Sequence, residues 1–364
     1  MKIDAEPTAL AAAAAWCAHA LPARPAVPVL TAMRLDAEGD SLTVSAFDYD
    51  LAATATIKVT VEEAGTVLLP GRLLAEITRS LPDRAVTITT DGSRAVLSCG
   101  PATFTLLTFP AEDYPSLPAM PPQAGTIGAD VLATAVAQAT AAAGKDDTLP
   151  ALTGALLDAA DGTLTLVCTD RYRLAVREVA WQPALGGEGR ALIPARALTA
   201  AAKAMTGGDV VTLCLGDGMA GLAGDGKTLV TRQIGGDFPQ YARLLPSEFT
   251  ATATVDGAVL AEAVKRAALV IERNTAVRLT FTPGSLQVAA GTGDGTGAQE
   301  TMEAGWEPDE TFTIAFSPAY LLDGLGALGP GEVSFGLTGE GKPALLTGAQ
   351  EGLRYLLMPI RLGS

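Results

Sequence analysis

"GTLTLVCTDRYRLA", residues 162–175, is the middle copy of a pattern that occurs three times in the chain. The first copy reads DSLTVSAFDYDLA (residues 40–52), and the third reads GSLQVAAGTGDG (residues 284–295). The corresponding leucines, Leu42, Leu164 and Leu286, stand 122 residues apart. Each copy alternates apolar and polar residues after a turn-forming Gly or Asp. This pattern is typical of a strand in a β-hairpin.

A second motif recurs in step with the first. It reads LLPGRLLAEI from residue 68, LIPARALTAA from residue 192 and AFSPAYLLDG from residue 315. The prolines of the three copies, Pro70, Pro194 and Pro318, stand 124 residues apart. Each follows a short apolar strand and precedes a segment with helical periodicity. Because proline is favoured in the first turn of a helix, we expect a helix to begin at each of them.

Each repeat also starts with a helical pattern, over residues 8–20, 129–143 and 257–271. The proline-bearing segments FPAEDYPSLP (residues 109–118) and FPQYARLLP (residues 238–246) lack helical periodicity and are interpreted as connectors between domains. The sequence thus predicts an α+β protein in which each repeat packs two helices on antiparallel sheets. The predicted domains are residues 1–121, 122–247 and 248–364.

Composition narrows the class of protein. The chain has 364 residues, 48% of them hydrophobic, and a formal net charge of −15, which argues against a nucleic-acid binder with a broad basic surface. No apolar run approaches the roughly 20 residues of a membrane helix, so we expect a soluble, cytoplasmic protein. Asp4 and Glu6 oppose an export signal at the alanine-rich N-terminus, and Pro7 favours a helix there.

The chain also offers little for catalysis or metal binding. Its four cysteines are widely spaced and accompany a single histidine, His19, so we expect buried reduced thiols, no metal site and no catalytic residues.

The segment GLAGDGKT, residues 221–228, matches the phosphate-loop pattern of nucleotide hydrolases. A phosphate loop requires a helix directly after it, because the helix amides bind the phosphates. Residues 228–234 are instead β-branched and alternating. We therefore expect a hairpin turn at Gly224-Asp225-Gly226 with Lys227 pointing into solvent, and a second hairpin loop at GTGDGTG (residues 291–297). A nucleotide hydrolase built on this segment is the alternative.

Four further segments, in order on this three-repeat frame, resemble one family over the whole chain. They are RPAVPVL from Arg24, CTDRYRLAVRE from Cys168, GGDFPQYARLLP from Gly235 and YLLMPIRL from Tyr355. The family is the bacterial sliding clamp, the β subunit of DNA polymerase III. The resemblance implies a non-catalytic processivity factor without a cofactor. It also implies a clamp loader, which uses ATP elsewhere, and partner proteins, among them the polymerase catalytic subunit, that carry short clamp-binding peptides.

The resemblance further implies a head-to-tail homodimer in which six domains form a ring around duplex DNA, with the helices lining the hole. By position, Phe104 and Leu106 would form one half of the interface, and Leu269 and Val270 the other. The alternative for these four residues is ordinary core.

A lining that slides along DNA needs only weak phosphate contacts. Arg24 matches a family position that touches DNA, whereas the other candidates follow from their helices, and solvated surface charge is the alternative for each. The candidates are Arg24, Arg72, Arg79, Lys145, Arg196, Lys203, Lys265, Arg266 and Arg273. We expect a sparse lining.

The resemblance also implies a peptide-binding pocket between the second and third repeats, apolar with a few polar groups at its rim. The residues that match its lining are Leu152, Thr169, Arg173, Leu174, Pro239, Arg243, Leu244, Leu356, Met358, Pro359, Ile360 and Arg361. The alternative is that the C-terminal strand only completes the third sheet.

Arg171 and Tyr172 depart from the family pattern, since many members carry a small residue and a histidine there. The tyrosine is expected to narrow the pocket or to add a stacking surface. The pair leaves open a specialised clamp copy tolerant of a clamp-directed inhibitor. A protein-binding scaffold that never encircles DNA is a further alternative.

Overall fold

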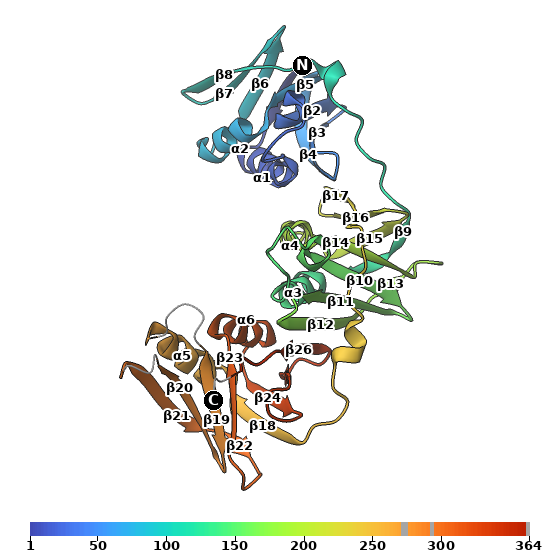
Figure 1. Cartoon of the computed structure of the whole chain (residues 1–364). Coiled ribbons are helices and arrows are strands. Elements are labelled where there is room, and N and C mark those ends of the chain that lie inside the picture. Colours follow the sequence, from blue (N-terminus) through green and yellow to red (C-terminus); the bar gives the residue numbers. More distant parts are fainter. Residues whose placement is uncertain (271–275, 292–294, 362–364) are drawn as a thin grey trace. The chain divides into compact units, whose positions relative to one another are not determined.

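The computed structural model describes residues 1–270, 276–291 and 295–361, and the chain divides into two compact units. Unit 1 comprises residues 1–132, 181–193 and 200–233. Unit 2 comprises residues 133–180, 194–199 and the described part of 234–364. Three repeats, each with two helices on antiparallel sheets, make up the chain (Figure 1). The helices are α1 (Pro7–Cys17), α2 (Gly71–Ser80), α3 (Ala129–Thr140), α4 (Ala195–Ala204), α5 (Gly257–Ala267) and α6 (Pro318–Leu328).

Short 3₁₀ turns extend several of these elements or lie in the connections. They are η1 (Ala18–Ala20), η2 (Pro28–Thr31), η3 (Ala111–Asp113), η4 (Pro150–Thr153), η5 (Tyr241–Leu244) and η6 (Ala268–Val270). Within the described residues, no helix has both the length and the apolar character needed to cross a bilayer.

Local signals explain where the helices begin. The Glu6 carboxylate accepts hydrogen bonds from the backbone amides of Thr8 and Ala9 and so caps the N-terminus of α1. Pro318 is the first residue of α6, as expected. Pro70 and Pro194 instead end strands directly before α2 and α4, so for these two the prediction of a first-turn proline was one position wrong.

The sheet of unit 1 has one main path and a branch. Its strand order is β13-β9-β15-β16-β17-β4-β1-β6-β7-β8, and β2, β3 and β5 attach through β4. The path strands are β13 (Gln182–Pro183), β9 (Gln123–Gly128), β15 (Val210–Gly216), β16 (Met219–Gly224), β17 (Lys227–Arg232), β4 (Leu51–Glu63), β1 (Lys2–Ala5), β6 (Val86–Asp91), β7 (Arg94–Cys99) and β8 (Ala102–Leu107). The branch strands are β2 (Ala32–Glu38), β3 (Ser41–Phe47) and β5 (Gly65–Pro70).

Unit 2 contains two sheets. The larger follows the order β10-β11-β12-β26-β25-β24-β18-β22, and the smaller the order β21-β20-β19-β23. The strands of the larger are β10 (Gly154–Ala160), β11 (Thr163–Thr169), β12 (Arg173–Ala180), β26 (Leu353–Leu357), β25 (Ala344–Thr347), β24 (Glu332–Leu337), β18 (Ala251–Asp256) and β22 (Gly305–Trp306). Those of the smaller are β21 (Gly297–Glu303), β20 (Ser285–Gly291), β19 (Val277–Thr282) and β23 (Phe312–Phe316). The remaining strand, β14 (Gly189–Pro194), lies directly before α4.

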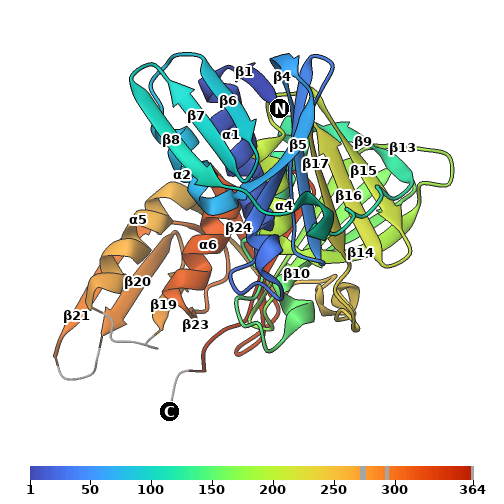
Figure 2. The ribbon, with the colours of Figure 1, turned by 90° about the horizontal axis from the view of Figure 1, so that it is seen from above.

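The repeated leucines lie in equivalent places. Leu42, Leu164 and Leu286 are at most 1% exposed, each near the start of the second strand of a hairpin. Helices cover these sheets on one face. In unit 1, α1 contacts α2, β3 and β4, and in unit 2, α5 contacts α6 and runs alongside β20 and β21 (Figure 2). All four cysteines are buried and free, and burial raises the pKa of the Cys17 and Cys168 thiols.

The candidate phosphate loop is a β-hairpin, as predicted. Strands β16 and β17 pair antiparallel from Met219 with Arg232 to Gly224 with Lys227. Asp225 and Gly226 form the turn with φ of 52° and 67°. The expectation that Lys227 points into solvent is wrong, because its ammonium lies 2.6 Å from the Asp225 carboxylate and its side chain is only 16% exposed. β20 and β21 also pair as a hairpin, and residues 292–294 of its loop lie outside the described part.

The turn geometry predicts how this hairpin responds to substitution. Replacing Gly226 with alanine places a Cβ at φ +67° and 3.1 Å from the Thr56 carbonyl oxygen. We expect G226A to lower the free energy of unfolding by about 1 kcal/mol, since the left-handed conformation disfavours a side chain. Gly235 meets no atom within 4 Å and lacks a positive φ, so G235A is the matched control. Equal denaturation midpoints for both variants would contradict the turn assignment.

Candidate functional site

A tight turn between β11 and β12 organises the candidate site. One oxygen of the Asp170 carboxylate accepts hydrogen bonds from the amides of Tyr172 and Arg173, both at 3.0 Å. The Thr169 hydroxyl donates to the Arg173 carbonyl at 2.6 Å. Arg171 lies at the turn with a φ of 79°, a conformation that disfavours most residues and that these side-chain bonds support.

Strand β12 then pairs with the C-terminal strand. The antiparallel register between β12 and β26 runs from Arg173 with Leu357 to Arg177 with Leu353. The Met358 amide donates to the Tyr172 carbonyl at 2.8 Å, which extends this pairing to the turn. β26 pairs with β25 on its other side, so the C-terminal strand both completes the third repeat's sheet and joins it to the second repeat.

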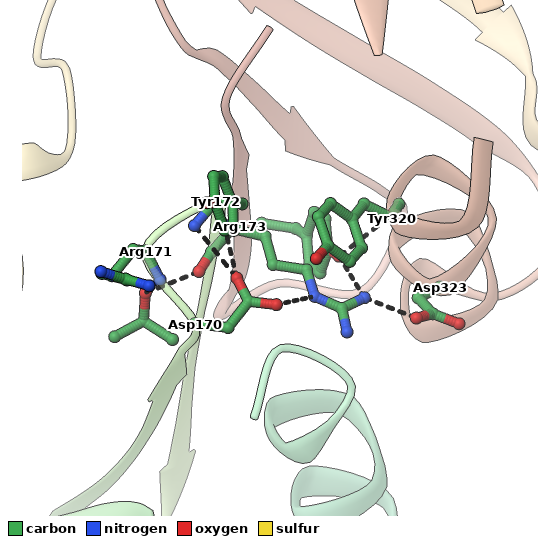
Figure 3. Close-up of polar contacts among 8 residues, drawn as sticks. Asp170, Arg171, Tyr172, Arg173, Tyr320 and Asp323 are labelled. Atoms are coloured by element: carbon green, nitrogen blue, oxygen red, sulfur yellow. Dashed lines mark hydrogen bonds and ion pairs between the residues drawn. The ribbon is translucent and has the colours of Figure 1, made fainter. Parts of the chain in front are cut away.

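Arg173 is the buried charge beneath the turn. Its side chain is 4% exposed, and its guanidinium donates to Asp170 at 3.0 Å and to Asp323 at 2.5 Å (Figure 3). It also donates to the Tyr355 hydroxyl at 3.4 Å and lies 4.4 Å from the centre of the Tyr320 ring. Burial alone would lower the pKa of Arg173, but the surrounding Tyr355, Asp323 and Asp170 outweigh it and raise the pKa. The guanidinium therefore stays charged.

An apolar cavity of about 370 Å³ opens beside this turn. We call it the apolar cavity, and its lining is Thr169, Arg171, Arg173, Leu174, Pro239, Leu244, Pro343, Leu356 and Met358. Two of its residues, Leu244 and Met358, are 53% and 41% exposed, so large apolar side chains stand open to solvent at the cavity. A concave apolar surface with a few polar groups at its edge suits the insertion of an apolar side chain from a ligand.

A second cavity, of about 350 Å³, adjoins the first through Arg171 and Arg173. We call it the polar cavity, because Lys145, Asp146, Asp170 and Asp323 also line it. Tyr172 lies here and not in the apolar cavity. Its ring is 6.1 Å from that of Tyr320 and nearly parallel to it. The Tyr172 ring therefore stacks on a residue of its own chain, and Tyr172 is not part of the apolar cavity's lining.

The structure thus brings most of the predicted pocket residues together. Eight of them line the apolar cavity, and Leu152 and Tyr172 line only the polar one. Arg243, Pro359, Ile360 and Arg361 line neither cavity. Pro343, Tyr320 and Asp323 were missed. Tyr320 and Asp323 stand one helical turn apart in α6, and a search for polar residues on one face of that helix would have flagged them.

The predicted DNA-contacting residues are all exposed where the structure describes them. Arg24 lies in the loop after η1, and Arg72 and Arg79 in α2; Lys145 follows α3, Arg196 and Lys203 lie in α4, and Lys265 and Arg266 in α5. The last two already have carboxylate partners. Lys265 lies 2.8 Å from Glu262, and Arg266 lies 2.6 Å from Glu300. Arg273 lies outside the described residues.

The four predicted interface residues differ in exposure. Leu269, in η6, is 84% exposed, and Val270 and Phe104 are half-buried. Leu106 is only 6% exposed, because strand alternation turns it toward the core of its own repeat. The neighbouring Leu107 faces the other way and is 67% exposed.

Comparisons with known proteins agree along the whole chain. Models of the N-terminal, central and C-terminal domains of the DNA polymerase III β subunit match residues 1–118, 126–240 and 242–361. The β sliding clamp of Streptomyces coelicolor is 47% identical over the full length of both chains. A β sliding clamp homologue of Streptomyces muensis is 39% identical over 99% of each. The griselimycin-bound sliding clamp of Pseudomonas aeruginosa has a TM-score of 0.92 and 27% identity, with both chains fully covered.

The buried ion pair predicts a stability effect at the site. R173M removes the guanidinium and leaves the Asp170 carboxylate, 13% exposed, without its charged partner. We expect the free energy of unfolding to fall by about 3 kcal/mol, mostly through Asp170, since Asp323 is half exposed and water screens it. R171M is the matched control, because Arg171 is exposed and has no ion pair among the described residues. Urea denaturation measures both, and a loss no larger for R173M than for R171M would show that the buried pair contributes little.

Proposed function

The chain belongs to the family of the DNA polymerase III β subunit, the bacterial β sliding clamps, and from this premise we propose that two copies join head to tail into a ring around duplex DNA. Like its family, the chain is a non-catalytic processivity subunit. The ring would hold six clamp domains, residues 1–121, 122–247 and 248–364 of each copy, and would act in the cytoplasm. It would keep the polymerase on DNA because an enclosed duplex cannot leave sideways.

Two strand edges, which pair with no further strand among the described residues, support the head-to-tail contact. β8 ends the sheet of unit 1, and β21 ends the smaller sheet of unit 2. An exposed strand edge carries unpaired amides and carbonyls and readily accepts another strand. Leu107 at the end of β8 and Leu269 in η6, which contacts β20, add exposed apolar surface. The two edges lie in different repeats, so pairing β8 of one copy with β21 of the other makes a heterologous interface. Such an interface closes into a ring of two copies when the rotation that relates one copy to the next is half a turn.

The proposed DNA contacts are sparse and weak. The exposed basic residues of α2, α4 and α5, with Arg24 and Lys145, would face phosphates without reading bases. Because Lys265 and Arg266 pair with carboxylates on the surface, a phosphate competes with those carboxylates, and exposed ion pairs of this kind contribute little. A net charge of −15 is compatible with this account, since enclosure and not adhesion retains the DNA.

The apolar cavity is the proposed docking site for partners. The observation that carries this proposal is an open apolar cavity of about 370 Å³ beside an ordered turn, with Met358 exposed at it. Its size suits a large apolar side chain, and the flexible thioether of Met358 adapts to different ligands. The ligands would be short extended peptides on the polymerase catalytic subunit, the clamp loader and other DNA enzymes.

The dimer proposal predicts how exposed leucines respond to charge. L269D and L107D each place a carboxylate in the proposed interface, and we expect each to weaken dimerisation at least tenfold because that charge loses its water. Leu185 is fully exposed in the loop between β13 and β14, so L185D is the matched control. Analytical ultracentrifugation measures all three. A wild-type monomer at micromolar concentration would favour a scaffold that never encircles DNA.

Enclosure predicts a topological form of retention. Protein loaded by a clamp loader onto a nicked circular DNA is expected to remain on it in about 0.5 M salt, a concentration at which phosphate contacts weaken strongly. Cutting the circle once is then expected to release the protein, which gel filtration detects. Protein that stays bound to the linear DNA would mean that adhesion and not enclosure holds it.

A further inference from the structure

Unit 1 contains a site with the same strand pattern as the apolar cavity. In unit 2, three neighbouring strands place Thr169 opposite Leu174 and Leu174 opposite Leu356. In unit 1, β3, β4 and β17 place Phe47 opposite Ala52 and Ala52 opposite Val230. We call the surface of Phe47, Ala52, Met219 and Val230 the unit 1 groove.

The turn beside the unit 1 groove is also equivalent. The Asp48 carboxylate accepts from the amides of Asp50 and Leu51 at 3.1 and 2.7 Å, as Asp170 does in unit 2. Tyr49 has a φ of 75°, close to the 79° of Arg171. The two sites therefore share both strand register and turn conformation.

The unit 1 groove differs in being occupied by the chain itself. The connector of residues 109–120, which runs from β8 past η3 toward β9 (Figure 1), packs Phe109, Tyr114, Leu117 and Met120 against it. Tyr114 is 6% exposed, and its burial in this cluster raises the pKa of its phenol to about 12.

Strand β16 leaves room for the connector at Gly221, which has no side chain. Met120 lies so close to Gly221 that a Cβ there would be 2.3 Å from its sulfur. In unit 2, Leu345 takes the place of Gly221, since each lies opposite the equivalent residue of the last strand, Leu356 or Val230. The second connector also leaves Leu244 53% exposed. The connector of unit 1 thus fills a groove that the connector of unit 2 leaves open.

We propose that the unit 1 groove is a second peptide-binding site, which residues 109–120 occupy as an intramolecular ligand. The ligand class is an extended, proline-rich peptide with large apolar side chains three residues apart, as at Tyr114, Leu117 and Met120. The inference rests on the proposed function of the apolar cavity. A tethered segment competes at an effective concentration on the order of millimolar, so it excludes weaker outside peptides. Each chain consequently offers one open site and one reserved site.

The test loosens the connector in the full chain and supplies its sequence from outside. L117S combined with M120S removes two apolar contacts from the intramolecular ligand, in a background of M358E, which blocks the apolar cavity. The probe is a fluorescein-labelled peptide of residues 109–121. We expect the loosened chain to bind one equivalent at least tenfold more tightly than M358E alone, by fluorescence anisotropy. The same peptide with serine at both positions is the matched control and is expected not to bind.

The outcomes separate the inference from the proposed function. Equal binding by M358E and the loosened chain, or equal binding of the control peptide, overturns the inference. The effect of M358E on partner peptides that bind wild-type chain tests the apolar cavity independently. Circular dichroism checks the fold of the double variant. Should that variant unfold, M120A in the same M358E background truncates one half-buried side chain and is expected to raise peptide binding at least threefold over M358E. Unchanged binding then overturns the inference.

Discussion

Backbone pairing between strands of consecutive repeats determines where the other features of this fold lie. The strand after the Asp-capped turn of one repeat pairs with the last strand of the next: β4 with β17, and β12 with β26. Each pairing satisfies amides and carbonyls that an isolated repeat would leave at an open edge. The same pairing fixes where the connector and the last strand meet the turn. The apolar cavity and the unit 1 groove both lie at that place.

An ion pair reinforces the second of these strand pairings, β12 with β26. Arg173 belongs to β12, whereas Asp323 belongs to α6, so their ion pair joins two repeats beneath the backbone pairing. A buried guanidinium needs several partners to offset its lost hydration, and Asp170, Asp323 and Tyr355 supply them. The equivalent position in unit 1 is the uncharged Leu51, whose amide donates to Asp48. The connector packs against the neighbouring Phe47, Ala52 and Val230 through apolar contacts. The same strand pattern therefore occurs in two forms. In unit 2 a buried ion pair lies beside the open apolar cavity, and in unit 1 apolar packing by the connector fills the unit 1 groove.

The fold was largely predictable because its signals are local and repeated. The leucine and proline spacings predicted three copies of one plan, and the β-branched residues after Lys227 predicted a hairpin in place of a phosphate loop. The site was predictable only in part. Resemblance identified Thr169, Leu174 and Met358, but no local pattern connects Arg173 with Asp323, which is 150 residues away. Whether Leu106 or Leu107 faces outward depends on the register of one edge strand, which packing and not composition decides.

In the proposed dimer, the strand pairing between repeats of one chain continues between chains through β8 of one copy and β21 of the other. Hydrogen–deuterium exchange of the amides in residues 102–107 and 297–303, followed as protein concentration rises through the dimerisation range, measures this most directly. We expect alternate amides in both strands to become protected together as the dimer forms. Exchange in both strands at the rate of open edges, in a sample shown to be dimeric, would contradict it.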